Sequence, residues 1–148
     1  NRFNKKYTFI CSFGNTIANI NSKNLNQSFK KINDVLQRNG QAIIHILNYA
    51  QILLNKERII NITQNKDLHF VRFYDFADDC LIFNILKYSK SNSKEHELLS
   101  TEIYPHTYET ILAILNTFSF KELNFYGSLN FEKFDVAKSK DLFISLIK

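Results

Sequence analysis

Three stretches near the start of the chain decide the fold: residues 7–13 (YTFICSF), 25–36 (LNQSFKKINDVL) and 42–47 (AIIHIL). The first and third are short, continuous apolar runs rich in β-branched and aromatic residues, which is typical of buried strands. The second has apolar residues at helical spacing on one face: Leu25, Phe29, Ile32, Val35 and Leu36. We expect Asn24 to cap this helix and Gly40 to end it. A strand, a helix and a strand in this order predict a right-handed parallel unit.

The middle of the chain changes to shorter strand patterns joined by polar turns. These strands are expected at about residues 58–63, 68–76, 80–88 and 98–104. The short connections between them favour an antiparallel meander. Next, Thr107 is placed to cap a helix, whose apolar side is formed by Tyr108, Ile111, Leu112, Leu115 and Phe118. Two further strands are predicted at residues 122–126 and 141–147.

Composition excludes several classes of protein. The chain has 148 residues, of which 45% are hydrophobic, so it is expected to fold as one domain. No apolar run is long enough for a membrane span, and the polar start of the chain does not resemble a secretory signal, which predicts a cytoplasmic location. Cys11 and Cys80 are interpreted as reduced packing residues. The four histidines are scattered, so no metal site is expected.

The net charge of +5 raises the possibility of a nucleic-acid partner. The lysines, however, occur in small groups beside loops or on polar helix faces, which favours a solvated surface. A nucleic-acid partner is therefore not expected. An RNA-binding domain or RNA methyltransferase stays open as a hypothesis, and it predicts binding that falls steeply with salt.

Glycine is scarce, and this limits the cofactor chemistry. The only glycines are Gly14, Gly40 and Gly127, so neither a GxGxxG nor a GxxxxGK[ST] loop can be present. The sequence also contains no methionine. Together these features predict a piece of a longer or divided protein.

Several short motifs follow one another along the chain. They read FGNTIANI at residues 13–20, DVLQRNG at 34–40, ILNY at 46–49, FVRFYDF at 70–76, YPHTY at 104–108 and FSF at 118–120, followed by Tyr126-Gly127. In this order and spacing the sequence resembles the second half of class I S-adenosylmethionine-dependent methyltransferases, most closely the small-molecule type related to glycine and sarcosine N-methyltransferases.

This resemblance implies an α/β fold: the C-terminal half of a Rossmann-like methyltransferase sheet, with its parallel strand-helix-strand unit and an antiparallel meander as a cap. Residues 1–50 and 105–148 would form the core sheet and helices, and about 55–104 the substrate-cap insertion. The first three strands of the family and its glycine-rich cofactor loop would be missing. The outer flank of the first strand would then be an unpaired edge. We expect that edge to pair with the missing N-terminal half or with a second copy of the chain.

The resemblance also implies a half-site for S-adenosylmethionine at the first turn. Phe13, Gly14, Asn15 and Thr16 would lie beside the methionine end of the cofactor, since ligands of such sheets bind beyond the carboxyl ends of the strands. The alternative is that Gly14 only permits the turn and Asn15 only caps the next helix.

Substrate contacts are expected from five residues: Asn48, Tyr49, Arg72, Tyr74 and Tyr104. The ring of Tyr49 could attract a cationic centre, and Arg72 could hold a carboxylate. The alternatives are a plain turn at Asn48 and Tyr49, a salt bridge from Arg72 to Asp75, Asp78 or Glu102, and simple packing of the other two tyrosines.

The sequence thus predicts the substrate-side portion of a methyltransferase acting on a small molecule, an amine by resemblance, and inactive without its missing half. No catalytic residue is assigned, because methyl transfer depends mainly on positioning. The competing hypothesis is a non-catalytic subunit derived from a methyltransferase, which binds or scaffolds and is completed by a partner chain.

Overall fold

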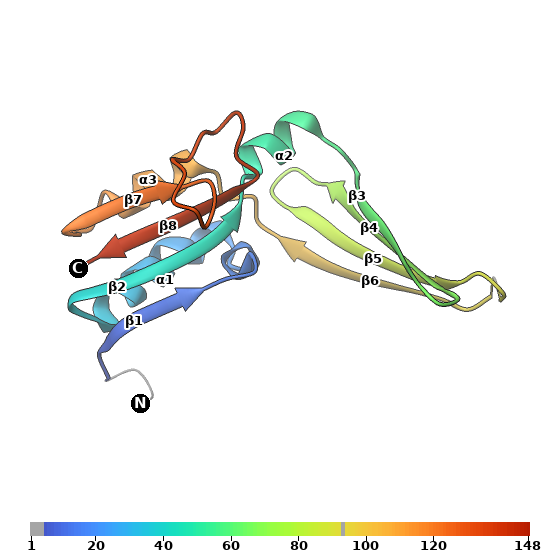
Figure 1. Ribbon diagram of the computed structural model, residues 1–148, viewed down its shortest axis with the longest axis horizontal. Helices are drawn as coiled ribbons and strands as arrows, with labels where there is room; N and C mark the ends of the chain where they lie inside the picture. The colour runs from blue at the N-terminus through green and yellow to red at the C-terminus, as the bar shows by residue number, and fades with distance from the viewer. Residues whose placement is uncertain (1–4, 93) are drawn as a thin grey trace. The chain divides into compact units, whose positions relative to one another are not determined.

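The computed structural model of the chain describes residues 5–92 and 94–148 (Figure 1). It divides into two compact units. The first unit consists of the residues up to Gln51 together with His106–Lys148, and the second consists of Ile52–Pro105. The chain is mixed α/β, as predicted, with one four-stranded sheet in each unit.

The first unit is built on a sheet with the strand order β1-β2-β8-β7. Strand β1 (Tyr7–Ser12) runs parallel to β2 (Leu36–Leu47), with Cys11 opposite Ile43. Strand β8 (Asp141–Ile147) lies antiparallel between β2 and β7 (Glu122–Tyr126). The observed bounds of β7 and β8 are those predicted from the sequence.

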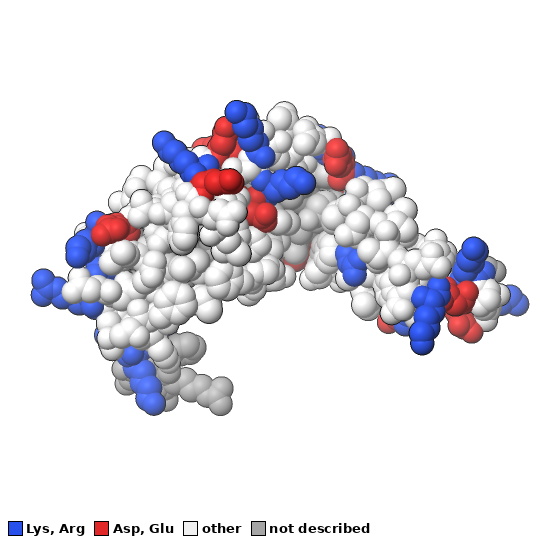
Figure 2. Space-filling view, viewed as in Figure 1, with Lys and Arg blue, Asp and Glu red and all other residues white. Residues whose placement is uncertain are grey.

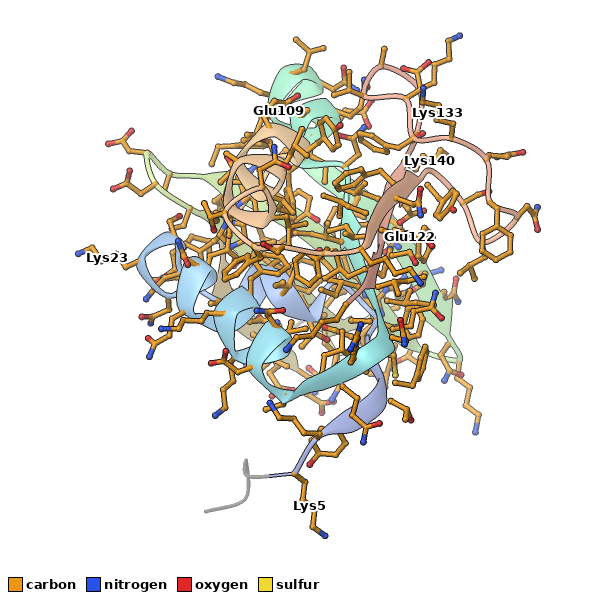
Figure 3. The ribbon with its side chains drawn as sticks, turned by 90° about the vertical axis from the view of Figure 1, so that its left-hand side faces the viewer. Lys5, Lys23, Glu109, Glu122, Lys133 and Lys140 are labelled. Atoms are coloured by element: carbon orange, nitrogen blue, oxygen red, sulfur yellow. The ribbon has the colours of Figure 1, made fainter. Side chains whose placement is uncertain are left out.

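Two helices cover one face of this sheet. Helix α1 (Ser22–Val35) and helix α3 (Tyr108–Leu115) lie on the same side of the strands (Figures 1 and 3). Alternate residues of β2 and β8 point toward them and are at most 1% exposed: Ala42, Ile44, Ile46, Leu142, Ile144 and Leu146. They meet Leu25 and Phe29 of α1 and Ile111 and Leu115 of α3, all completely buried. This layer is the hydrophobic core of the first unit.

The opposite side of the sheet, called here the open face, is covered by no helix among the described residues. It carries Phe9, Ile43, His45 and Phe143, and Phe9 is 51% exposed. Figure 2 shows few charged side chains over the middle of this face. Sheets built with parallel strands normally bury both faces. The open face is therefore a surface of the first unit that another element would normally cover.

Residues 7–13 were predicted to form a buried strand, and this is wrong for the described chain. Strand β1 lies at the edge of the sheet, and β2 is its only neighbour within the described residues. The side chains of β1 are therefore largely exposed, including Cys11, which was predicted to be packed. An apolar run indicates a buried strand only when both neighbours are present.

The ends of the first long helix also differ from the prediction. Asn21, not Asn24, is the cap, and its side-chain oxygen accepts a hydrogen bond from the backbone N–H of Asn24. The helix ends at Val35, and β2 begins at once, so Gly40 lies inside a strand. A Cβ at Gly40 would come within 3.1 Å of the Thr8 carbonyl oxygen, so this glycine permits a close approach of β1 rather than ending the helix.

The second long helix begins as predicted and ends earlier. Thr107 caps α3 through a hydrogen bond from the N–H of Thr110. The helix stops at Leu115, so Phe118 lies beyond it. Two short helices complete the first part of the chain: a 3-10 turn, η1 (Thr16–Asn19), and α2 (Tyr49–Asn55).

The second unit is a single antiparallel sheet in sequential order. Its strands are β3 (Ile59–Asn65), β4 (Leu68–Phe76), β5 (Leu81–Ser89) and β6 (His96–Ile103). Every neighbouring pair is antiparallel. The turn between β3 and β4 contains Lys66 at a φ of 55°, a left-handed conformation suited to a tight hairpin.

Candidate functional site

A side-chain bridge joins the two turns that follow the parallel strands. Asn15 follows β1, and its Nδ2 donates a hydrogen bond of 2.7 Å to the hydroxyl of Tyr49, which follows β2. The Oδ1 atom of Asn15 accepts a hydrogen bond of 3.1 Å from the N–H of Leu47. The sequence predicted both turns as parts of the ligand site, and the structure brings them into contact.

The first turn leaves space above its glycine. Gly14 has a φ of 70°, and an added Cβ would meet nothing within 4 Å. Asn15 follows in the left-handed region at 63°, which Asn tolerates better than most residues. Thr16 closes the turn, because its hydroxyl donates to the carbonyl oxygen of Phe13 at 2.6 Å. The turn is therefore a fixed backbone loop with an open side.

Asn48 anchors a long loop that the sequence analysis missed. Its Nδ2 donates to the carbonyl oxygens of Val136 at 2.9 Å and Ser139 at 2.8 Å. Its backbone N–H donates to the carbonyl oxygen of Lys140 at 2.9 Å. Asn48 is only 3% exposed. Both amide hydrogens of this side chain are thus engaged by the connection between β7 and β8, about ninety positions away in the sequence.

Tyr49 is completely buried. Its hydroxyl is the group that accepts from Asn15, so this tyrosine acts in the described chain as a support of the first turn. A direct contact of Asn48 or Tyr49 with a substrate stays a prediction.

A histidine and an aspartate lie together on the open face near the same rim. The Nε2 of His45 is 2.9 Å from an Oδ1 of Asp141, and the His45 ring stacks on Phe143 with centroids 4.6 Å apart. The sequence analysis missed this pair. The alternation in residues 42–47 places His45 on the other face of the sheet from Ile44. Only the antiparallel register of β2 and β8 brings Asp141 next to His45.

A pocket of about 220 Å³ also lies on the open face. Phe13, Tyr126, Phe131 and Phe143 form its aromatic part, and Asn124 is among its polar residues. Phe131 is 73% exposed and has a φ of 63°, a strained value for a bulky residue. The β7–β8 loop that Asn48 anchors therefore contributes to the wall of a cavity that also reaches Phe13.

The other three predicted substrate residues belong to the second unit. Arg72 donates from Nη1 to Asn61 Oδ1 at 3.1 Å and to Thr63 Oγ1 at 3.2 Å. These neutral partners on β3 are not the carboxylates that the alternative of a salt bridge named. Asp75 instead pairs with Arg58. Alternation along β4 places Arg72 and Tyr74 on one face of that sheet.

The two tyrosines of this group have raised pKa values for different reasons. Tyr74 is 6% exposed, and burial of its hydroxyl raises the pKa. The Tyr104 hydroxyl donates to Glu102 Oε2 at 3.0 Å, and this hydrogen bond to a carboxylate raises its pKa. Both phenols are therefore proton donors at neutral pH, and neither is set up as a base.

The described residues also bear on metal and membrane binding. Within residues 5–92 and 94–148, His, Cys, Asp and Glu side chains do not gather in threes in a way that could hold a metal ion. None of the helices in this described part of the chain has the length and apolar character of a membrane span.

Comparison with known proteins gives a result from structure alone. No protein-family model matches the sequence, and no curated protein matches it. The solved methyltransferase CcbJ from Streptomyces caelestis is 12% identical and has a TM-score of 0.80 over 96% of this chain. A S-adenosylmethionine-dependent methyltransferase from Clostridium acetobutylicum is 15% identical, with a TM-score of 0.74 over 97% of this chain.

A third similar structure is the sugar N-methyltransferase KedS8 from a Streptoalloteichus species, with 10% identity and a TM-score of 0.60 over 100% of this chain. The chain spans 61%, 59% and 60% of the lengths of these three proteins, respectively. At such low identity the likeness concerns the fold. It confirms, at that level, the resemblance to S-adenosylmethionine-dependent methyltransferases predicted from the motifs.

Proposed function

We propose that this chain is the substrate-side portion of a S-adenosylmethionine-dependent methyltransferase that acts on a small molecule bearing an amine. The observation that carries the proposal is the bridge from Asn15 to Tyr49 and Leu47. It holds two turns together at the carboxyl ends of adjacent parallel strands, where ligands of such sheets bind.

The first turn fits one edge of the cofactor. S-adenosylmethionine, when bound, supplies an electrophilic methyl group on a sulfonium. Open space lies above Gly14, so a ligand can approach its backbone without meeting a side chain. Asn15 holds the turn in place through its hydrogen bonds to Leu47 and Tyr49. The chain has no glycine-rich loop for the rest of the cofactor, which would be held by residues outside this sequence.

The chemistry required of these residues is positioning. A neutral amine already carries the electron pair that attacks the methyl group, so no strong base is needed, and orientation with exclusion of water can supply most of the acceleration. The part-buried bridge at Asn15 and the loop anchored by the buried Asn48 are fixed features of the kind that such positioning needs. The pocket of about 220 Å³ beside Phe13 offers aromatic surface for the acceptor.

The arrangement of the fold is part of the same proposal. Residues 1–50 and 105–148 form half of a Rossmann-like sheet, and about 55–104 form a cap that brings Arg72, Tyr74 and Tyr104 to the substrate. The edge of β1 and the open face would be covered by the first half of the fold, on the same or another chain. Until that half is present, the chain is inactive.

The amine acceptor is supported by the comparison with KedS8, which is described as a sugar N-methyltransferase. The motifs resembling glycine and sarcosine N-methyltransferases point the same way.

Calorimetric titration tests the proposal. S-adenosylmethionine is titrated into this chain and into a longer version that includes the preceding coding sequence. We expect binding only to the longer chain, and Gly14→Asn in that chain should weaken it at least about tenfold. Asn tolerates the left-handed backbone while its side chain enters the open space. Binding to neither chain would overturn the proposal that S-adenosylmethionine is the cofactor. Equal binding to both would overturn the proposal that this chain holds only half of the cofactor site.

A second candidate is a non-catalytic subunit, and the burial of Asn48 and Tyr49 favours it. Both side chains are engaged in holding turns and loops, which a scaffold requires and a substrate contact does not. A purified complex with a partner chain that carries the glycine-rich loop distinguishes the two. In the scaffold case, Phe131→Ala and Tyr126→Ala would leave the turnover of the complex unchanged. In the enzyme case, they would raise KM for the acceptor.

A further inference from the structure

The outer edge of strand β7 is occupied over only part of its length. β7 ends the strand order of the first sheet, with β8 on its inner side. On its outer side, the N–H of Phe134 donates to the carbonyl oxygen of Phe125 at 3.2 Å. The N–H of Gly127 donates to the carbonyl oxygen of Glu132 at 2.8 Å. The β7–β8 loop thus folds back and forms a single antiparallel bridge with the C-terminal half of β7.

The other half of this edge presents backbone groups to solvent. In an antiparallel sheet the N–H and C=O of one residue point to the same side, and successive residues alternate. Because the C=O of Phe125 points outward, the N–H and C=O of Leu123 also point outward, away from β8. Within the described chain, no residue pairs with Leu123 on that side. An unpaired edge of this kind is a template for another strand.

A pocket of about 470 Å³ lies beside Leu123. The ring of Tyr108 on α3 meets the ring of Phe125 edge-on, with centroids 4.9 Å apart, and lies 5.3 Å from the ring of Phe134. Because Tyr108 belongs to a helix and contacts Phe125, the side chain of Leu123 also faces the helix side of the sheet. A residue paired with Leu123 would therefore place its side chain in this pocket, where the surrounding rings favour an aromatic group.

The charged side chains at this pocket have opposite signs. Glu109 on α3 and Lys133 on the loop both line it (Figure 3). Neither side chain forms a hydrogen bond or an ion pair with another described residue. A strongly acidic or strongly basic partner would find no complementary field at such a balanced border. The site therefore suits a segment whose recognition rests on backbone hydrogen bonds and an apolar side chain.

A second copy of the chain does not fit this edge. A twofold axis at Leu123 would bring the residue before β7 of the second copy opposite Phe125, where Phe134 already lies. The next register that keeps outward groups facing each other would place Glu122 opposite its own copy, and like charges directly opposite destabilise a strand pair. The occupant is therefore a different sequence.

We propose that an extended segment of another protein adds to the first sheet as a fifth strand at Leu123 and places an aromatic side chain against Tyr108. The N–H of that aromatic residue donates to the carbonyl oxygen of Leu123, and its C=O accepts from the N–H of Leu123. The segment runs antiparallel to β7, as residues 132–134 do, and begins beside Phe134. Main-chain hydrogen bonds give affinity in this mode of recognition, and the side-chain pocket gives specificity. The inference does not rest on the proposed function, because it uses only the outer edge of β7.

Hydrogen exchange of single amides, followed by NMR of the whole chain, tests the edge. The amide of Leu123 points outward, and the amide of Asn124 points toward β8. Leu123 should therefore exchange at least about tenfold faster than Asn124 in the free chain. The peptide acetyl-Phe-Thr-Thr-Thr-amide is the probe, since it is neutral, favours an extended conformation and starts with the aromatic residue. An excess of this peptide should slow exchange at Leu123 and leave Asn124 unchanged.

Two matched changes separate strand addition from simple filling of the pocket. A peptide with a methyl group on the phenylalanine nitrogen keeps the ring but loses the donor, so calorimetry should show at least about tenfold weaker binding. Leu123→Pro removes the outward N–H of the chain and no bond to β8, and it should weaken binding of the unmodified peptide. Leu123→Ala keeps this N–H and should weaken binding less. Circular dichroism shows that each variant is folded.

Several results would overturn the proposal. One is an amide of Leu123 that is as protected as that of Asn124 in the free chain, and another is no binding of the unmodified peptide at about 1 mM. Equal binding of the two peptides would assign the pocket to an aromatic ligand without strand addition. Protection of Leu123 without peptide, in a chain extended by the preceding coding sequence, would show that the protein fills this edge itself.

Discussion

The two sheets of this protein obtain their stability in different ways. The first has one face sealed by α1 and α3, with Ile44 and Ile144 completely buried beneath them. The second unit contains only the end of one helix, residues 52–55 of α2, and its strands are held by cross-strand neighbours such as Val71 and Leu86. Buried area stabilises the first sheet, while paired side chains and backbone hydrogen bonds stabilise the second. A sheet of the second kind depends more on what binds to its faces.

The largest expected effect lies in the core of the first sheet. Ile44 and Ile43 are adjacent in β2, and the former is completely buried while the latter lies on the open face. Ile44→Ala should lower the free energy of unfolding by about 2–5 kcal/mol, because it leaves a cavity. Ile43→Ala should cost clearly less. Urea unfolding followed by circular dichroism measures both.

Hydrogen exchange resolved by peptide gives the control for this pair. Ile44→Ala should speed exchange in β2 and β8 and leave β4 and β5 nearly unchanged, if the two units are separate cooperative bodies. Equal losses of stability from the two isoleucines would show that the open face is already covered in solution, so that both faces of the first sheet are buried.

Patterns within a single helix or strand predicted many of the elements. Contacts between residues far apart in the sequence could not be predicted from such patterns. The cap at Thr107, most of the two amphipathic helix faces and the bounds of β7 and β8 follow from spacing within about fifteen residues. The helix end at Gly40 was wrong, because a glycine that lets β1 approach closely looks the same in a sequence as one that ends a helix. The exposure of β1 was missed, because burial depends on a neighbouring strand rather than on the strand itself.

The candidate site also contains residues that the sequence motifs indicated and contacts that only the structure shows. The motifs pointed to Asn15 and Tyr49, and the structure joins them by a hydrogen bond of 2.7 Å. Neither the anchoring of the β7–β8 loop by Asn48 nor the pairing of His45 with Asp141 leaves a trace in the sequence. Both contacts cross more than eighty positions and depend on β8 lying between β2 and β7.

A smaller effect concerns pH and the first unit only. His106 is 4% exposed, and its Nε2–H donates to the carbonyl oxygen of Ile20 at 2.7 Å. Burial lowers the pKa of this imidazole below its usual value near 6.5. Above about pH 6.5 the ring is neutral in both the folded and the unfolded chain. Below that pH the unfolded chain binds a proton that the folded chain does not, so stability falls as the pH decreases.

The measurement is the change in free energy of unfolding between about pH 7.5 and about pH 5.5, a range that spans the ordinary histidine pKa. His106→Gln keeps a donor for Ile20 but cannot titrate, so its loss of stability over this range should be smaller than that of the unsubstituted chain. Identical losses would show that the imidazole of His106 is protonated without cost in the folded state. The hydrogen-exchange response should appear in α1 and α3 and not in the second sheet.

The smallest effect is expected at the ion pair of the second sheet. Arg58 and Asp75 have side chains that are 66% and 45% exposed, so solvent screens their attraction. Arg58→Ala should therefore change the free energy of unfolding by no more than about 1 kcal/mol. Asp75 keeps the hydrogen bond from Asn84, which is 3% exposed. A large loss of stability from Arg58→Ala would mean that this pair is shielded from solvent in the protein, because only a desolvated pair is strongly destabilised by removal of one partner.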